Sequence, residues 1–285
     1  MRTTRRDLLA MGTRTKGLYV SDECIHGFVD GMCATCNPKP VEAAPVAVKS
    51  APRGRVATAQ RPTVRSLRAA ARIPLGVSPG DVVLEQRIYH LTHIRNLAAI
   101  VESGALSAGI DPVVGLSPAA LRDERADFLI GGSSDKPVSD YVPFFLSPDA
   151  TLWATVRAGD VHPRVSAEAA AADTSEFVFL VSTVRHVSAA GRDFVVADGN
   201  SEGTTTRFGV TKEDAERMLY RLRFEADGSG LLDGELLVDA TLPLESITLV
   251  GVQNDKVRAQ VREILDGSDF TPKISVYPPW FQPAE

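Results

Sequence analysis

The amino-acid sequence predicts an α+β fold, built on a mixed or split antiparallel sheet with helices on its flanks. Short apolar and aromatic runs typical of strands recur from residue 81 onward. Helical patterns separate only some of these runs, so the regular alternation of a doubly wound α/β fold is missing. Neither a Walker loop nor a G-x-G-x-x-G motif occurs, which argues against P-loop and Rossmann folds.

Residues 88–104 predict a strand that leads directly into a helix. Residues 88–91 are short, apolar and aromatic, and apolar residues then recur at helical spacing up to a glycine that stops the helix. We expect Thr92 to be the N-cap, which places His90 at the strand end and His93 in the first helical turn. Such a junction suits a ligand that carries phosphates. A histidine at a strand end is nevertheless more often a structural, hydrogen-bonded residue.

The remaining elements of the body follow from the same patterns. Strands are expected at 140–148, 177–181, 194–197, 234–238 and 247–252, and helices at 121–126, 152–156, 212–223 and 255–265. Residues 198–200 are expected to form a turn. Phe144 and Trp153 are expected in the core. The C-terminal tail is assigned to 271–285, and residues 274–285 of it are expected to pack loosely or fray.

Length and composition predict one large domain with appendages. The chain has 285 residues and no run long and apolar enough to span a membrane, so we expect a cytoplasmic protein with no membrane partner. We divide it into a basic disordered tail at 1–20, a zinc knuckle at 21–40, a flexible Pro-, Ala- and Arg-rich linker at 41–80, and a folded domain at 81–270.

The zinc knuckle is predicted from a cluster that holds all three cysteines of the chain. Cys24, His26, Cys33 and Cys36 form the pattern C-x-H-x6-C-x2-C within 13 residues. Three thiolates and one imidazole make a closed tetrahedral Zn²⁺ set, so we expect a structural metal ion. The alternative is a set of free thiols in a tail.

Charge is distributed unevenly along the chain. Residues 1–80 hold 13 basic and 5 acidic residues, whereas the remainder holds 18 basic and 31 acidic ones. A basic arm on an acidic body fits nucleic-acid contact through the arm, because basic side chains displace counterions from phosphates. A solubilising tail explains the same pattern.

Three separated segments resemble the DarT family of DNA ADP-ribosyltransferases, the toxins of toxin–antitoxin pairs. Residues 89–97, YHLTHIRNL, are similar to the family's opening Y-H-x-T-H-x-x-N-L. Residues 140–148, DYVPFFLSP, are similar to its D-Y-V-P-F-Y-F-x-P, and residues 234–238, GELLV, to its glutamate-bearing strand. The resemblance covers roughly residues 86–266 and implies an ADP-ribosyltransferase fold, a split sheet with NAD⁺ in its cleft.

The resemblance also implies the site residues. The catalytic carboxylate falls on Glu235. An arginine that holds the cofactor, and that we count with Glu235 as catalytic, falls in the helix-compatible segment 121–126, where Arg125 is preferred to Arg122. The remaining candidates for the NAD⁺ site are His90, Thr92, Asn96 and Tyr141.

These residue types suit the chemistry. Loss of nicotinamide from NAD⁺ makes an oxocarbenium-like centre, as in glycoside hydrolysis, and a nearby carboxylate such as Glu235 stabilises it. The arginine fork matches a pyrophosphate. A strand carboxylate such as Glu235 more often faces solvent, however, and Glu245 is the competing candidate.

The function predicted is NAD-dependent ADP-ribosylation of a nucleobase in single-stranded DNA by a toxin, with a macrodomain-type antitoxin as a possible partner. Other readings are an RNA or protein acceptor, or an inactive zinc-knuckle nucleic-acid-binding module. Residues 149–152 depart from the family's Arg-Ser-Pro-Met, which leaves thymine and guanine both open as target bases.

Overall fold

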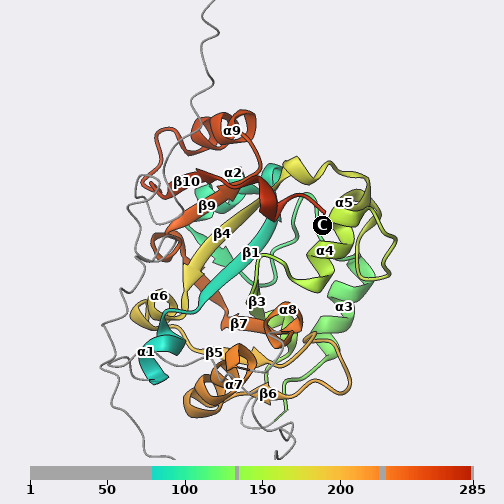
Figure 1. The fold of residues 1–285 in the computed structure, drawn as a ribbon, viewed down its shortest axis with the longest axis vertical. Helices are drawn as coiled ribbons and strands as arrows, with labels where there is room; N and C mark the ends of the chain where they lie inside the picture. Colours follow the sequence, from blue (N-terminus) through green and yellow to red (C-terminus); the bar gives the residue numbers. More distant parts are fainter. Residues whose placement is uncertain (1–78, 132–134, 225–228, 284–285) are drawn as a thin grey trace, which may run out of the picture. The chain divides into compact units, whose positions relative to one another are not determined.

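A mixed sheet forms the centre of the computed structural model (Figure 1). The structure describes residues 79–131, 135–224 and 229–283, which all belong to the second of two units of the chain, Arg61–Glu285. Among these residues the sheet has eight strands in the order β10-β9-β4-β1-β3-β7-β5-β6. All its neighbouring strands are antiparallel except β9 and β10. The predicted α+β class is therefore confirmed.

The strands of the main sheet and of a small second sheet have the following bounds. In the main sheet they are β1 Arg87–His93, β3 Tyr141–Phe145, β4 Phe177–Thr183, β5 Phe194–Ala197, β6 Phe208–Gly209, β7 Glu235–Asp239, β9 Leu249–Val252 and β10 Lys273–Val276. The second sheet pairs β2 Ala105–Ser107 with β8 Thr241–Pro243.

Helices lie on both faces of the sheet (Figure 1). They are α1 Pro79–Leu84, α2 Ile94–Ser103, α3 Ala119–Asp127, α4 Thr151–Ala158, α5 Ala167–Ala171, α6 Val184–Ala189, α7 Lys212–Phe224, α8 Gly230–Asp233 and α9 Asp255–Leu265. Buried side chains from α1, α2, α6, α7 and α9 pack against one face of the sheet, which we call the first face, and share one core with its side chains. Those from α4 and α5 pack with the second face, where Trp153 and three phenylalanines meet.

The sheet is divided between β1 and β3. Seven residues of β1 pair with β4, but only Tyr89 pairs with β3, opposite Phe145. Pro143 gives the reason, because its carbonyl points toward β1, where it meets the His90 ring. The N and O atoms of one strand residue point to the same side, so Pro143 has no N–H to offer β1. The two halves of the sheet separate at this position.

Most of the predicted elements are confirmed, and the helix at 255–265 has the predicted bounds. The predicted N-cap of α2 is wrong. Thr92 is still in β1, and His93 is the N-cap, with its Nδ1 accepting a hydrogen bond from the Arg95 N–H at 3.2 Å. Threonine and histidine side chains can both accept the N-cap hydrogen bond. Because β1 pairs with β4 as far as His93, the helix starts one residue later than predicted.

The prediction of a loosely packed C-terminal tail is also wrong. β10 extends the sheet alongside β9, and Trp280 and Phe281 are buried against the second face. The indole N–H of Trp153 donates to the Trp280 carbonyl at 2.6 Å, and the buried Arg157 donates to the carbonyls of Pro279 and Trp280. Prolines near the end of the chain suggested an irregular tail, whereas its aromatic side chains complete the core.

The tail, zinc knuckle and most of the linker predicted for residues 1–80 lie outside the described residues. Cys24, His26, Cys33 and Cys36 are among them, so the zinc site stays a prediction. Within the described ranges, no group of three or more His, Cys, Asp and Glu side chains is placed to hold a metal ion. No helix in these ranges is both long and apolar enough to cross a bilayer.

Candidate active site

One cavity of about 440 Å³ opens where the sheet divides. Its walls come from β1, β3, the start of β7, α2, α3 and the residues 108–118, which we call the cavity loop. All six candidates that the sequence offered for catalysis or NAD⁺ binding line it, namely His90, Thr92, Asn96, Arg125, Tyr141 and Glu235. They come from segments up to 145 residues apart, from His90 to Glu235.

His90 connects the two halves of the sheet at the cavity. Its Nδ1 lies 2.9 Å from the Pro143 carbonyl, which can only accept, so Nδ1 carries the proton. Loss of surrounding water lowers the pKa of His90, although the hydrogen bond to Pro143 opposes this effect. The neutral ring keeps Nε2 as an acceptor, which suits a ribose hydroxyl.

Asn96 holds the cavity loop against β1. Its Nδ2 donates to the Thr92 hydroxyl at 3.0 Å and to the Val114 carbonyl at 2.8 Å, and its Oδ1 accepts from the Val114 N–H at 3.0 Å. The amide is buried and both of its N–H groups are committed to protein. Asn96 therefore shapes the wall of the cavity, while the Thr92 hydroxyl keeps its own proton to donate.

Glu235 is the buried carboxylate of the cavity. It begins β7, has a total exposure of 7 %, and lies opposite Phe145 of β3 and Ala197 of β5. Its Oε2 accepts from the Ser201 N–H at 3.3 Å, and its Oε1 lies 3.6 Å from Arg164 Nη2. A buried carboxylate requires such partners, so the strand does not simply point it to solvent. The competing Glu245 is exposed and does not line the cavity.

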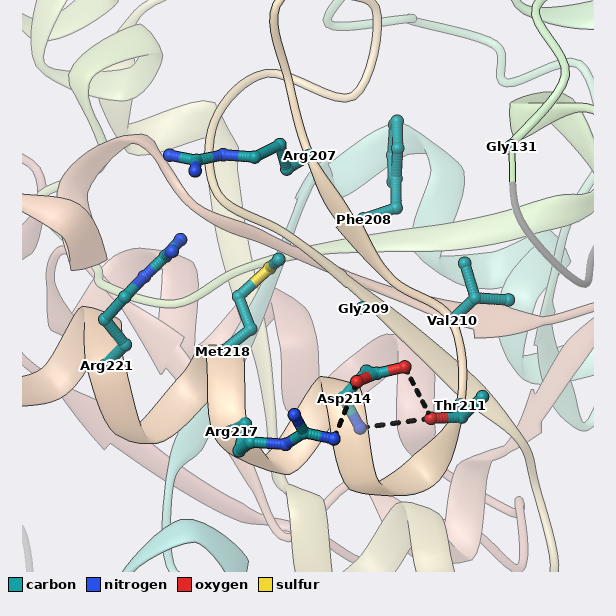
Figure 2. Close-up of a pocket in the computed structure, with 10 residues that line it drawn as sticks. All are labelled: Gly131, Arg207, Phe208, Gly209, Val210, Thr211, Asp214, Arg217, Met218 and Arg221. Carbon is teal, nitrogen blue, oxygen red and sulfur yellow. Dashed lines mark hydrogen bonds and ion pairs between the residues drawn. The ribbon is translucent and has the colours of Figure 1, made fainter.

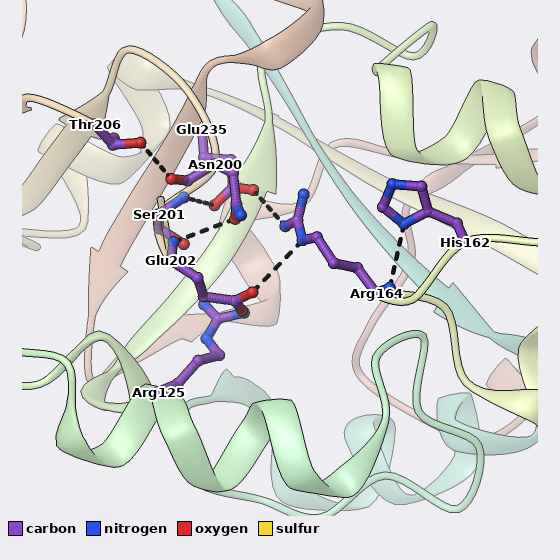
Figure 3. Close-up of polar contacts among 8 residues, drawn as sticks. All are labelled: Arg125, His162, Arg164, Asn200, Ser201, Glu202, Thr206 and Glu235. Atoms are coloured by element: carbon purple, nitrogen blue, oxygen red, sulfur yellow. Dashed lines mark hydrogen bonds and ion pairs between the residues drawn. The ribbon is translucent and has the colours of Figure 1, made fainter. Parts of the chain in front are cut away.

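Arginine and glutamate side chains alternate around this carboxylate (Figure 3). Glu202 lies between two arginines, with Arg125 Nη1 at 3.5 Å from Oε1 and Arg164 Nε at 3.5 Å from Oε2. Arg164 continues the series to Glu235. We call Arg125, Glu202, Arg164 and Glu235 the charge network; its two positive and two negative side chains balance.

The arginines of the cavity keep donors available. Among the described residues, Arg122 Nε and Arg125 Nη2 are buried and make no hydrogen bond, whereas the buried Arg164 Nε faces Glu202 Oε2 at 3.5 Å. Buried donors are usually satisfied, so the unpartnered Arg122 and Arg125 donors fit an anionic ligand. Both arginines line the cavity and both are already engaged, Arg122 with the Ser117 carbonyl at 2.7 Å and Arg125 with Glu202 at 3.5 Å, so the preference for Arg125 stays a prediction.

The aromatic candidates differ in position. Tyr141 lines the cavity but packs among buried residues that include Val195 and Leu237, and only 5 % of it is exposed. Phe144 and Trp153 are core residues, as expected, with 1 % and 0 % exposure. Stacking of a base or of nicotinamide on Phe144 is therefore incompatible with its burial.

Sequence reasoning missed Arg164, Ser201 and Glu202. Arg164 lies in the connection between α4 and α5, where no motif marks it. Ser201 and Glu202 directly follow the predicted turn at 198–200, and a turn pattern by itself predicts no role for the side chains after it. This loop also spells G-x-S-x-G, the hydrolase elbow pattern. It joins two antiparallel strands rather than a strand and a helix, and Ser201 Oγ makes no hydrogen bond to any described residue.

A second cavity, of about 730 Å³, lies beside β6 and α7 (Figure 2). Three arginines line it, but Arg217 pairs with Asp214, and Arg207 and Arg221 both pair with Asp198. None of the predicted site residues reaches it. The first cavity is therefore the candidate active site.

A divided mixed sheet, with a histidine, arginines and a buried glutamate at the division, agrees with the class of NAD-dependent ADP-ribosyltransferases that the sequence motifs predict. The family model described as "ssDNA thymidine ADP-ribosyltransferase, DarT" matches residues 89–282. This chain belongs to the DarT family.

Similar proteins agree with this assignment. A "DNA ADP-ribosyl transferase" of Thermus sp. (strain 2.9) is 24 % identical over 205 residues, which are 68 % of this chain and 95 % of that protein. A protein of the same description from Thermus aquaticus is 23 % identical over 184 residues, covering 62 % and 80 % of the two chains. The structure titled "Thermus sp. 2.9 DarT in complex with ADP-ribosylated ssDNA" has a TM-score of 0.58 at 21 % identity, and covers 69 % of this chain and 96 % of that one. These likenesses support the fold.

Proposed function

We propose that this protein transfers ADP-ribose from NAD⁺ to a thymine base in single-stranded DNA, with Glu235 as the catalytic carboxylate. The observation that carries the proposal is the convergence of all six candidate residues on one cavity with a buried carboxylate. Thymine is chosen over guanine because the matching family is described by thymidine. A similar Thermus sp. 2.9 structure is titled as a complex with NAD⁺, at a TM-score of 0.54.

The residues of the cavity divide the work between cofactor and reaction. Arg125, whose Nη2 has no hydrogen-bond partner among the described residues, would hold the pyrophosphate of NAD⁺. Neutral His90 would accept from a ribose hydroxyl through Nε2, and the Thr92 hydroxyl would donate beside it. Tyr141 borders the same space, and Asn96 fixes the loop that closes it.

Glu235 would act at the bond that changes. NAD⁺ supplies an electrophilic anomeric carbon with nicotinamide as leaving group. The bond from that carbon to the nicotinamide nitrogen breaks, a bond to the base N3 forms, and Glu235 accepts the N3 proton. The carboxylate also stabilises the positive charge that develops on the ribose. A base must leave its stack for its N3 to reach the anomeric carbon of a bound NAD⁺, which favours single-stranded DNA.

The test is mass spectrometry of oligonucleotides incubated with the protein and NAD⁺. We expect a gain of one ADP-ribose on thymine-containing DNA, and a loss of about 100-fold or more in Glu235→Gln, which keeps the size of the side chain. The matched control is Glu245→Gln, because Glu245 is exposed and outside the cavity. Labelling of guanine-only DNA, of RNA, or of protein instead would overturn the choice of acceptor.

The proposal extends to toxicity, to an antitoxin and to zinc. Expression in a bacterial host should arrest growth, Glu235→Gln should relieve the arrest, and a macrodomain-type hydrolase should remove the DNA label. Metal analysis should find one Zn²⁺ per chain, lost when Cys33 and Cys36 are replaced by serine. Normal growth of a host that contains active protein contradicts the proposed toxicity. A chain that contains no metal contradicts the proposed zinc site.

A further inference from the structure

We propose that Glu202 and Arg164 are positioning residues for the ADP-ribosyl transfer. Glu202 does not line the cavity, but it contacts Arg125 and Arg164, which do. Arg164 in turn holds the carboxylate of Glu235 (Figure 3). The inference rests on the proposed function of Glu235.

Burial makes the contacts of Glu202 consequential. Its side chain is 13 % exposed, and those of Arg125 and Arg164 are 15 % and 23 % exposed. A carboxylate removed from water to this extent is costly unless cations face it, and each arginine gains a partner in the same way. Removing Glu202 therefore leaves two positive side chains next to a single carboxylate, Glu235. Arg164 would then be drawn fully onto Glu235, and Arg125 would lose its fixed position.

The backbone of Glu202 is held by its own turn. Its N–H donates to the Asn200 Oδ1 at 3.2 Å, and the Asn200 carbonyl accepts from the Gly203 N–H at 2.8 Å and from the Thr206 hydroxyl at 2.6 Å. The neighbouring Ser201 N–H binds Glu235 directly. One short loop thus presents both the carboxylate that fixes the arginines and a donor that fixes the catalytic carboxylate.

The backbone around Arg164, in the α4–α5 connection, is also held by hydrogen bonds. Its N–H donates to His162 Nδ1 at 3.2 Å. Two residues later, Ser166 donates its hydroxyl to the Gly115 carbonyl at 2.6 Å and its N–H to the Leu116 carbonyl at 2.8 Å. The α4–α5 connection therefore joins the cavity loop to Glu235, and its hydrogen bonds hold the backbone on each side of the charge network.

The contacts within the charge network are ion pairs rather than tight hydrogen bonds. They span 3.5 to 3.6 Å, and Glu202 Oε1 and Arg164 Nε form no hydrogen bond within the described residues. Small shifts of the arginines are therefore inexpensive, so their places depend on the balance of charge. If the network positions the arginines, a change in its charge alters kcat. A merely structural ion pair would affect folding alone.

The experiment is a double-mutant cycle on nicotinamide release from NAD⁺, measured without DNA so that water is the acceptor. We expect Arg164→Gln to lower kcat about 10- to 100-fold, as small misplacements of reacting groups do, with the KM for NAD⁺ changed less than about threefold. Glu202→Gln should lower kcat about tenfold and also raise KM, because it releases Arg125. Arg164→Lys keeps the positive charge but has one ammonium group in place of the two nitrogens that meet Glu202 and Glu235, so it should recover only part of the lost kcat.

The double variant is decisive. If Glu202 acts through Arg164, Glu202→Gln/Arg164→Gln should be no more than about twofold slower than Arg164→Gln alone. The control is Arg185→Gln, which breaks an exposed pair with Glu85 outside the cavity and should leave kcat unchanged. Three results would overturn the proposal. The first is a double variant whose loss in kcat is the product of the two single losses, and the second is a kcat within twofold of wild type in both single variants. The third is a loss in kcat that follows the melting temperature in every variant, including Arg164→Lys. A parallel DNA-labelling reaction with the wild type reports on the acceptor alone, so failure there refutes the proposed function and leaves the cycle interpretable.

Discussion

Gly234, immediately before the proposed catalytic carboxylate, allows a quantitative test of how closely Glu235 is positioned. A Cβ added here would lie 2.8 Å from the Gly230 carbonyl oxygen, 2.9 Å from Leu146 Cδ1 and 3.1 Å from Leu222 Cδ1. Its φ of −70° and ψ of 146° are ordinary for alanine. Gly234→Ala is therefore a purely steric change, with no contribution from backbone strain.

The magnitude follows from these contacts. Carbon atoms prefer about 3.5–4.0 Å, so Leu146 or the start of β7 must move by roughly 0.6 Å or more. The Gly230 oxygen cannot retreat freely, since it accepts the Gly234 N–H at 3.0 Å. Overpacking of this kind costs about 1–3 kcal/mol. A shift near 1 Å at the attached Glu235 would lower kcat by about 100-fold, with little change in the KM for NAD⁺.

Nicotinamide release and thermal unfolding would be measured on the same preparations of Gly234→Ala. Gly131→Ala is the matched control, because its added Cβ meets nothing within 4 Å. A Gly234→Ala variant that keeps the wild-type kcat and melting temperature would refute the reasoning. A variant that loses stability but not kcat would show that the position of Glu235 tolerates such a shift.

Other perturbations test the rest of the site and the core. Asn96→Ala removes three hydrogen bonds that hold the cavity loop, so the KM for NAD⁺ should rise about tenfold, as measured by nicotinamide release; an unchanged KM contradicts this role. Burial lowers the pKa of His90 and of His93, so the unfolded chain binds more protons below about pH 6.5, and the free energy of unfolding should fall as the pH drops from there; flat denaturant midpoints from pH 7 to 5 refute it. Gly251→Ala would place a Cβ 2.5 Å from Trp280 Cζ3, so it should cost about 1–3 kcal/mol and shift indole fluorescence, whereas unchanged urea unfolding would show that the C-terminus is not packed there.

The sequence predicted those parts of the fold that local patterns determine. Helical spacing marked the residues of α2 and α9, and aromatic runs marked β3 and β4. The boundary at Thr92 was misplaced because strand pairing, which is not local, extends β1 through His93. The C-terminus was misjudged for a related reason, since Trp153, which donates to the Trp280 carbonyl, lies more than 100 residues earlier in the chain.

The site shows the same limit. The residues of the recognised motifs, such as His90 and Glu235, could be named because the resemblance supplied their positions. Arg164 could not, because its value depends on meeting Glu202 and Glu235, 38 and 71 residues away, and an arginine in a connecting segment looks the same whether or not such partners exist. Charge networks built from separate loops require the fold before they can be read.

Pro143 connects the motif at 140–148 to the cavity in physical terms. In a central strand a proline is unfavourable, because it cannot supply a ladder hydrogen bond. Here it prevents β3 from pairing with β1 beyond Tyr89, and its carbonyl accepts the Nδ1 proton of His90. The lost backbone pairing opens the space between the strands, and the retained carbonyl fixes the tautomer that leaves Nε2 as an acceptor. The proline thus accounts for the division of the sheet beside the cavity and orients His90, one of the proposed binding groups.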